Sequence, residues 1–271
     1  MLDKSFYKKY GPWALILGAA EGIGEAYSIT LAESGLNLIM VDKEETSLNL
    51  LAQKLQFEKN IKCKTLSIDL KEKDATEKIM EVIQLLDCRL LIYNAAYSKV
   101  QRFVDLKKDD LDSFIDVNTR TQIHIVQEFS KKLINKKHGG GILLMSSLAG
   151  LIGVQLVAPY AATKAFAWNL AEALHYELKA HTIDVMACLA GATETPTYNS
   201  THPKYGLLKP SVMSGKGVAE SALKALGKQH RFIPGFSNRL NYFLLTRIFP
   251  RKWAASIANK TIYSMYKDTL N

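Results

Sequence analysis

Short apolar runs alternate with amphipathic stretches along the 271-residue chain. The runs are nearly continuous in apolar residues, a pattern typical of strands that are covered on both faces of a sheet. The predicted strands are Trp13–Leu17, Asn37–Val41, Lys62–Ser67, Leu90–Tyr93, Ile142–Ser146, Ile183–Cys188 and Arg231–Ile233. The predicted helices are Ile23–Ser34, Thr46–Phe57, Lys73–Leu86, Leu111–Ile134, Pro159–Ala180 and Lys216–Lys228. This alternation predicts an α/β fold, a doubly wound parallel sheet of about seven strands with helices on both faces.

The pattern changes after Ile233, where Pro234-Gly235 marks a turn. Leu240–Phe249 and Trp253–Met265 then have the pattern of basic amphipathic helices. Two roles stay open for them: packing over the sheet edge or a subunit interface, or peripheral contact with a membrane surface, since Trp, Phe and Lys/Arg segregate as they do in interfacial helices. We expect residues 1–271 to form one domain with a C-terminal helical extension over 236–271.

Composition excludes several classes of protein. The net charge is +9, but the cations are scattered among acids and are not interleaved with aromatics, so no nucleic-acid partner is expected. Three distant cysteines show no metal-ligand spacing, so we expect reduced structural thiols and no metal. The N-terminus lacks a signal pattern, and the uncharged stretch Gly139–Thr163 fits a strand, turn and helix better than a membrane span. The expected location is cytoplasmic, without a transmembrane segment.

A glycine-rich turn, Gly18-Ala19-Ala20-Glu21-Gly22-Ile23-Gly24, joins the first predicted strand to the first predicted helix. Glycines let the chain turn sharply and let backbone N–H groups approach a pyrophosphate, which the dipole of the helix N-terminus also favours. The position between a strand and a helix near the start of a β-α chain predicts a dinucleotide site in a Rossmann fold. The candidate contacts are Gly18, Ala20, Glu21, Gly22, Ile23 and Gly24.

Acidic residues follow the second and third predicted strands. Asp42 is placed to hydrogen-bond the adenosine ribose hydroxyls, and with Glu21 it would repel a 2′-phosphate, so NAD is favoured over NADP. The neighbouring Lys43 argues for NADP. Asp69 is a candidate acceptor for the adenine amino group and equally a turn or cap residue. The remaining candidate contacts in these segments are Leu70, Asn94, Ala95 and Ala96.

Tyr160 and Lys164 are four residues apart, which places both on one face of a helix. An ammonium beside a phenol lowers the phenol pKa and makes it a usable acid or base near neutral pH. Ser147 lies 13 residues before Tyr160, just after an apolar strand. The sequence therefore predicts proton transfer at this end of the sheet.

These motifs together resemble the short-chain dehydrogenase/reductase family over nearly the whole chain. The matching segments are Leu17-Gly18 through Gly24, Tyr93-Asn94-Ala95-Ala96, Asn118 in Asp116-Val117-Asn118, the set Ser147, Tyr160 and Lys164, and Ala190-Gly191 followed by Thr195-Pro196. The chain departs from the family pattern at Leu17, Tyr93, Ala96 and Ala190. All four departures concern turn architecture or cofactor support rather than proton-transfer groups.

The resemblance implies hydride transfer between a nicotinamide cofactor and an alcohol or ketone. It implies that Ser147 binds the substrate oxygen, that Tyr160 exchanges the proton, that Lys164 binds the nicotinamide ribose, and that Asn118 holds a relay water. Gly191, Thr193 and Thr195 are implied to hold the carboxamide, and residues 192–215 to form a substrate lid. A homo-oligomer, a dimer or tetramer, is also implied.

The substrate is expected to have an apolar portion, because the lid segment is rich in aromatic and aliphatic residues. The opening Tyr10–Ala14 and the Pro234-Gly235 tail resemble the branch of 17β-hydroxysteroid and 3-oxoacyl-thioester reductases. Two alternatives stay open: a 3-oxoacyl-thioester or steroid-type reductase that uses NADPH, and a non-catalytic nicotinamide-binding regulator.

Overall fold

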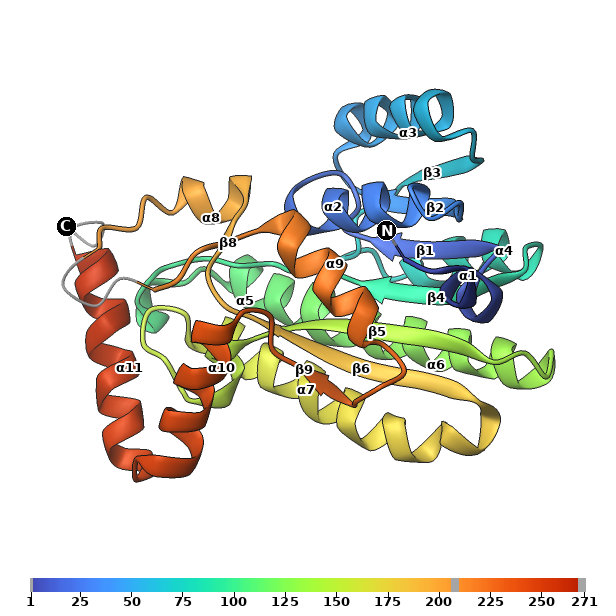
Figure 1. Cartoon of the computed structure of the whole chain (residues 1–271). Coiled ribbons are helices and arrows are strands. Elements are labelled where there is room, and N and C mark those ends of the chain that lie inside the picture. The colour runs from blue at the N-terminus through green and yellow to red at the C-terminus, as the bar shows by residue number, and fades with distance from the viewer. Residues whose placement is uncertain (1, 206–209, 268–271) are drawn as a thin grey trace.

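The computed structural model describes residues 2–205 and 210–267, and its centre is a parallel sheet (Figure 1). Seven strands pair in the order β3-β2-β1-β4-β5-β6-β9. Their bounds are β1 Trp13–Leu17, β2 Asn37–Asp42, β3 Cys63–Ser67, β4 Cys88–Tyr93, β5 Gly140–Ser147, β6 Ile183–Ala190 and β9 Arg231–Phe232. The predicted seven-stranded doubly wound fold is confirmed.

Helices cover both faces of the sheet, in two layers. One layer holds α1 Lys4–Tyr10, α2 Gly22–Ala32, α3 Glu45–Lys59 and α9 Gly215–Ala225. The other holds α4 Ala75–Gln84, α6 Thr121–Asn135 and α7 Ala158–Glu177. Successive strand residues serve opposite layers, so Ala14 and Ile16 pack into the first core while Leu15 and Leu17 pack into the second. Double coverage explains why the strands are continuous apolar runs.

The strand order reverses between β1 and β4. From β1 the chain continues to β2 and β3 at one edge of the sheet, and then returns to β4 and continues through β5 and β6 toward the other edge. Leu17 at the end of β1 pairs with Val41 on one side and Tyr93 on the other. In open parallel sheets, ligands bind outside the carboxyl ends of the strands at such a switch point. The glycine-rich turn, Asp42 and Asn94 therefore lie around one crevice.

Two parts of the helical prediction were incomplete. The short helix α1 was not predicted, although Phe6 and Tyr10 are four residues apart and both buried. Its Tyr10 hydroxyl donates a 2.6 Å hydrogen bond to Asp184 on β6. The predicted helix Leu111–Ile134 is three pieces: α5 Lys108–Ile115, a π-helical turn Asp116–Arg120, and α6. Periodicity cannot reveal a single extra residue inside a long helix.

Two further short strands, β7 Thr193–Glu194 and β8 Met213–Ser214, pair at the two ends of the predicted lid segment. A short helix, α8 Pro196–Ser200, follows β7. The predicted lid residues Leu207 and Leu208 lie outside the described residues. The remaining short elements are η1 Phe103–Asp105, η3 Leu148–Leu151 and η4 Lys179–His181.

The C-terminal residues form a helical hairpin at one side of the sheet (Figure 1). It consists of α10 Phe236–Phe243, a π-helical turn Leu244–Ile248 and α11 Arg251–Tyr266. The guanidinium of Arg231 lies 4.9 Å from the ring centre of Tyr242 and 5.7 Å from that of Trp168, and so ties α10 to α7. Among the described helices, none combines the length and the apolar character that crossing a bilayer requires.

Candidate active site

Three glycines of the turn after β1 occupy positions that disfavour any residue with a Cβ. Gly18 has φ +75°, and an added Cβ would lie 2.7 Å from the Ala95 backbone. Gly22 has φ +60° and faces Thr195, while a Cβ on Gly24 would lie 1.7 Å from the Gly18 carbonyl oxygen. Because α2 begins at Gly22, its first N–H groups face this narrow turn. The geometry fits a dinucleotide pyrophosphate, since backbone amides meet a helix N-terminus where no side chain intrudes.

Asn94 fastens the turn to the end of β4. Its Nδ2 donates to the Gly18 carbonyl oxygen at 2.8 Å, and its backbone N–H donates to Leu17 O at 3.0 Å. The Ala95 N–H donates to the same Leu17 oxygen at 2.8 Å. These bonds use main-chain groups of Leu17 and Gly18, so the turn stays fixed to β4 despite the departure from the family pattern at Leu17.

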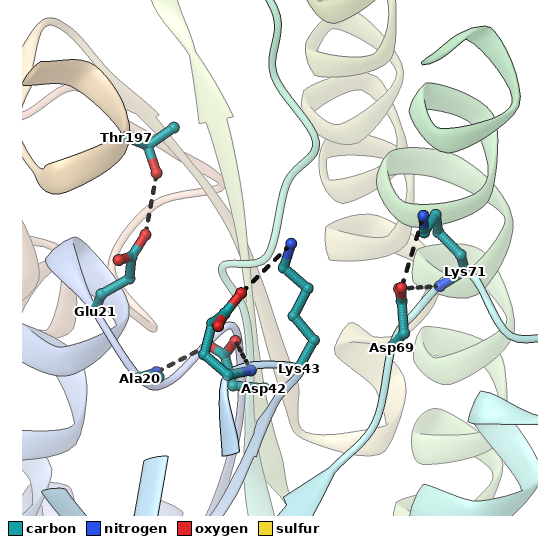
Figure 2. Close-up of polar contacts among 8 residues, drawn as sticks. Ala20, Glu21, Asp42, Lys43, Asp69, Lys71 and Thr197 are labelled. Atoms are coloured by element: carbon teal, nitrogen blue, oxygen red, sulfur yellow. Dashed lines mark hydrogen bonds and ion pairs between the residues drawn. The ribbon is translucent and has the colours of Figure 1, made fainter. Parts of the chain in front are cut away.

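Asp42 also supports the turn (Figure 2). Its Oδ2 accepts the Ala20 N–H at 2.9 Å, and its Oδ1 accepts the Glu44 N–H at 3.2 Å. The neighbouring Lys43 extends toward the Glu44 carboxylate, with 3.6 Å between Nζ and Oε1. Asp42 thus faces the region of the glycine-rich turn, and it retains lone pairs beyond the two bonds it accepts.

The other two predicted acids have partners within the protein (Figure 2). Glu21 accepts a 3.1 Å hydrogen bond from the Thr197 hydroxyl of α8, which connects the turn to the predicted lid. Asp69 accepts the Lys71 N–H at 2.9 Å and lies 3.7 Å from the Lys71 Nζ. Asp69 therefore has the contacts of a turn residue, one of the two interpretations that the sequence left open.

Tyr160 and Lys164 lie on α7 beside the end of β5. The Lys164 Nζ is 5.6 Å from the ring centre of Tyr160 and donates a 2.8 Å hydrogen bond to Met145 O. Ser146 fixes the helix against the strand, because its hydroxyl donates to Lys164 O at 2.7 Å. On the outer side, a Cβ on Gly150 would lie 2.7 Å from the backbone of Lys164 and Ala165, so only glycine allows this close packing.

Burial dominates the electrostatics of this pair. Desolvation lowers the pKa of Lys164 to about 8, and desolvation raises the pKa of Tyr160 above its usual value, an effect that a hydrogen bond with Ser147 partly offsets. The expectation that Lys164 lowers the Tyr160 pKa was wrong, because burial sets the direction of the shift. The lysine hydrogen-bonds a main-chain carbonyl and is itself desolvated, so its charge does not determine the shift.

Asn118 lies in the π-helical turn and is 2% exposed. Its Oδ1 accepts the Tyr97 N–H at 2.7 Å, and its Nδ2 donates to Tyr97 O at 2.9 Å and to the Thr163 hydroxyl at 3.0 Å. The side chain is thus paired with the backbone after β4 and with α7. Tyr93, a departure from the family pattern, supports the same turn by donating a 2.6 Å hydrogen bond to Val117 O.

The remaining candidates occupy the ends of β3, β5 and β6. Ser147 ends β5, and its Oγ accepts the Ala149 N–H at 3.2 Å. Leu70 is buried, and its carbonyl accepts from the Thr121 hydroxyl at 2.7 Å. Past β6, the Thr193 hydroxyl donates to Gly191 O at 3.1 Å, and Thr195 caps α8 through a 3.1 Å bond from the Tyr198 N–H. Ile23 and Ala96 lie at the same edge, as residues of α2 and of the segment after β4.

Sequence reasoning missed three residues that shape this site. Tyr97 and Thr163 hold Asn118, and Asn238 of α10 lies against Gly191, where an added Cβ would come within 2.7 Å of its amide. Thr163 was visible in principle, because it lies three residues after Tyr160 on the same helix. Tyr97 acts through its backbone, and Asn238 is distant in sequence, so neither had a local signal. Within residues 2–205 and 210–267, no cluster of His, Cys, Asp or Glu has the makeup of a metal site.

The short chain dehydrogenase family profile matches residues 12–206. The chain belongs to this family. It is an NAD(P)-dependent oxidoreductase that acts on CH–OH and C=O groups of a small-molecule substrate. The alternative of a non-catalytic regulator is therefore set aside.

Curated relatives of this short-chain dehydrogenase include two kinds of enzyme. It is 29% identical over 235 residues to a 7beta-hydroxysteroid dehydrogenase of Clostridium sardiniense, with 87% of this chain and 90% of the relative covered. It is 32% identical over 184 residues to a very-long-chain 3-oxoacyl-CoA reductase of Neurospora crassa, with 66% and 55% covered. A solved structure from work on 7beta-hydroxysteroid dehydrogenase stereoselectivity superposes with a TM-score of 0.85 at 24% identity, covering 93% of this chain and 98% of that one, and shares its fold.

Proposed function

We propose that this short-chain dehydrogenase exchanges a hydride between NAD and an alcohol or ketone with a large apolar portion, using Asn118, Ser147, Tyr160 and Lys164. One observation carries the proposal. Tyr160 and the buried Lys164 share one face of α7 at the carboxyl end of β5, with Nζ 5.6 Å from the phenol ring centre. A phenol and an amine so placed beside a dinucleotide crevice suit proton exchange with a substrate oxygen.

Each side chain has a physical task in this proposal. Burial keeps the proton on Tyr160 at neutral pH, which suits donation to a carbonyl oxygen. The Ser147 hydroxyl, which accepts from a backbone N–H, can turn its own proton toward the charge that develops on that oxygen. Lys164, with a pKa of about 8, can exchange protons near neutral pH. Asn118 fixes the backbone after β4 against α7, so it positions the groups that react.

The dinucleotide, when bound, supplies or accepts the hydride. The turn amides and helix N-terminus would hold its pyrophosphate, Asp42 its adenosine ribose, Lys164 its nicotinamide ribose, and residues after β6 its carboxamide. The proposed contacts are Gly18, Ala20, Glu21, Gly22, Ile23, Gly24, Asp42, Lys43, Asp69, Leu70, Asn94, Ala95, Ala96, Tyr160, Lys164, Gly191, Thr193 and Thr195.

The preference for NAD rests on the charges around β2. Asp42 faces the turn, where a carboxylate suits two ribose hydroxyls and repels a 2′-phosphate. The Lys43 Nζ lies 3.6 Å from the Glu44 carboxylate, which reduces the attraction that Lys43 offers to a phosphate. The Asp42 carboxylate therefore favours NAD, against a weakened opposing charge on Lys43.

The apolar character of the predicted lid and of the residues packed near it supports a bulky substrate. The lid carries Tyr198, Tyr205 and Met213, and a small cluster of Leu156, Met265 and Tyr266 joins α11 to the loop before α7. The similarity to 7beta-hydroxysteroid dehydrogenases suits a rigid polycyclic alcohol or ketone of this kind. A second candidate is a 3-oxoacyl thioester reduced with NADPH, which Lys43 and the similarity to 3-oxoacyl-CoA reductases favour.

The proposal includes a reducing compartment, the cytoplasm, and a homo-oligomer. Cys63, Cys88 and Cys188 are all free thiols. On the outer side of α7, Ala158, Ala161, Ala162 and Ala165 line a hollow of about 390 Å³ that another helix could fill. A dimer or tetramer formed through this face is expected, and a monomeric mass in light scattering would contradict it.

The test compares Tyr160→Phe with wild type in two assays, NADH binding by fluorescence and ketone reduction followed by NADH absorbance. The proposal requires Tyr160→Phe to bind NADH normally while turnover falls at least about 1,000-fold. Tyr176→Phe is the matched control, because Tyr176 lies on the same helix with 65% of its surface exposed. Normal turnover by Tyr160→Phe, or equal loss in both variants, would refute the assigned role.

A further inference from the structure

The C-terminal hairpin, α10 to α11, has an unbalanced charge. From Phe236 to Lys267 it contains six cations and no acidic residue; the cations are Arg239, Arg247, Arg251, Lys252, Lys260 and Lys267. All six side chains belong to exposed residues, and none forms an ion pair with a residue that the structure describes. The chain as a whole carries +9, so most of its excess positive charge belongs to this one hairpin.

The same hairpin exposes large apolar side chains. Seven of the eighteen exposed large hydrophobic residues of the described chain lie here: Phe236, Leu240, Phe243, Ile248, Trp253, Ile257 and Tyr263. The first three are spaced four and three residues apart, so they form one stripe on α10. Trp253 and Ile257 are likewise neighbours on α11. Apolar groups gathered to this extent mark an interaction surface.

The bend of the hairpin combines both kinds of residue. Arg247, Ile248, Arg251, Lys252 and Trp253 are all exposed around the turn between α10 and α11. In Figure 1 this turn is the extreme end of the hairpin, away from the sheet. A projecting tip with an indole, an aliphatic group and three cations has the composition of a segment that sits at a lipid headgroup layer.

The other side of the hairpin is fixed to the enzyme. Asn259 Oδ1 accepts the Gln155 N–H at 2.7 Å, Asn259 Nδ2 donates to Gly153 O at 3.0 Å, and Gln155 Nε2 donates to Asn259 O at 2.9 Å. Met265 O accepts the Lys204 N–H at 3.0 Å. The exposed face is therefore presented by an anchored element, and little conformational entropy is lost when it docks.

We propose that the C-terminal hairpin binds membrane surfaces that contain anionic lipids, with Trp253, Ile248 and Phe243 entering the headgroup region. The charge of this face favours a bilayer over a second copy of the chain as its binding partner. A symmetric dimer would bring twelve cations together without a counter-charge, because an isologous interface uses the same patch twice. An anionic bilayer supplies both the counter-charge and an apolar layer.

The experiment is co-sedimentation of the full chain with vesicles. Vesicles of phosphatidylcholine with 30% phosphatidylglycerol are expected to bind at least about 10-fold more tightly than phosphatidylcholine alone, and added salt is expected to weaken binding. Arg247→Gln with Lys252→Gln should lower affinity about 25-fold, since each cation near an anionic surface contributes about fivefold. Equal binding to both vesicle types, or none, would overturn the proposal.

Matched variants separate insertion of the hairpin into the lipid from nonspecific adsorption of the protein. Trp253→Ser is expected to lower vesicle affinity at least about fivefold, whereas Phe57→Ser should leave it unchanged, because Phe57 is 92% exposed on α3, far along the chain from the hairpin. Vesicles should also shift the wild-type fluorescence to shorter wavelength, and Trp253→Phe should remove that shift. An unchanged Trp253→Ser affinity, or a hairpin-dependent dimer in light scattering that excludes vesicles, would contradict the lipid surface.

Discussion

The Nζ atom of Lys164 donates a 2.8 Å hydrogen bond to the carbonyl oxygen of Met145, inside a region where the lysine is 4% exposed. This contact joins the helix of the proposed catalytic residues to strand β5 of the sheet. It also holds an amine where its charged form is disfavoured, because a single main-chain dipole replaces the water that would otherwise solvate it. The consequences can be measured in both stability and activity.

Lys164 is expected to make the stability of the enzyme depend on pH. Burial lowers its pKa from 10.5 to about 8, so between pH 8 and 10.5 the unfolded chain binds more protons than the folded one. The cost is fully present below pH 8 and is relieved as pH rises through that window. Relative to Lys164→Met, wild type should gain up to about 3 kcal/mol from pH 7 to 10.5 in urea unfolding. Lys54→Met, at an exposed site, is the control, and parallel curves for wild type and Lys164→Met would contradict the effect.

Asp42 is expected to govern cofactor choice. Asp42→Asn keeps an oxygen for the Ala20 N–H but removes the charge that repels a 2′-phosphate. The ratio of kcat/KM for NADPH to that for NADH should rise about 10-fold. Lys43→Met should move the ratio the other way, and Asp69→Asn should leave it nearly unchanged. An unaltered ratio in Asp42→Asn would remove Asp42 from cofactor selection.

Gly18 and Gly35 form a matched pair, since both have positive φ. At Gly35 an added Cβ meets nothing within 4 Å, whereas at Gly18 it meets the Ala95 backbone at 2.7 Å. Gly35→Ala should therefore cost only about 1 kcal/mol of conformational strain and keep NADH affinity. Gly18→Ala should displace the turn and lower NADH affinity at least about 10-fold, as measured by fluorescence titration. Equal NADH affinity in the two variants would show that the close approach is unimportant.

Asn118 is expected to matter more for stability than an ordinary helix residue. Asn118→Leu removes three hydrogen bonds and leaves both backbone groups of Tyr97 without their partner. The free energy of unfolding, measured in urea, should fall by about 3 kcal/mol. Thr163→Val removes one of the three and should cost about 1 kcal/mol. Turnover should fall in both variants in the same order. A smaller cost for Asn118→Leu than for Thr163→Val would be inconsistent with this network.

Local sequence patterns were sufficient to predict the sheet and the candidate residues beside it. Continuous apolar strands, the glycine-rich turn and the Tyr160–Lys164 spacing each depend on neighbours within a few residues, so the sequence could indicate them. The π-helical turn at Asn118 could not be predicted, because its contacts are with residues distant in sequence, such as the hydrogen bond that Val117 O accepts from Tyr93, 24 residues away. The predicted direction of the Tyr160 pKa shift was wrong for a similar reason, because burial is a property of the assembled fold.

The hydrogen bonds between Asn259 and the 153–155 loop affect how relatives should be compared. The family profile ends at residue 206, yet the loop beside α7 is fastened by a residue more than fifty positions later. Proteins that share every motif of the nucleotide crevice can differ completely in this late segment. Inferring the substrate of one member from another therefore requires comparison of the C-terminal helices, which lie beyond the end of the family profile.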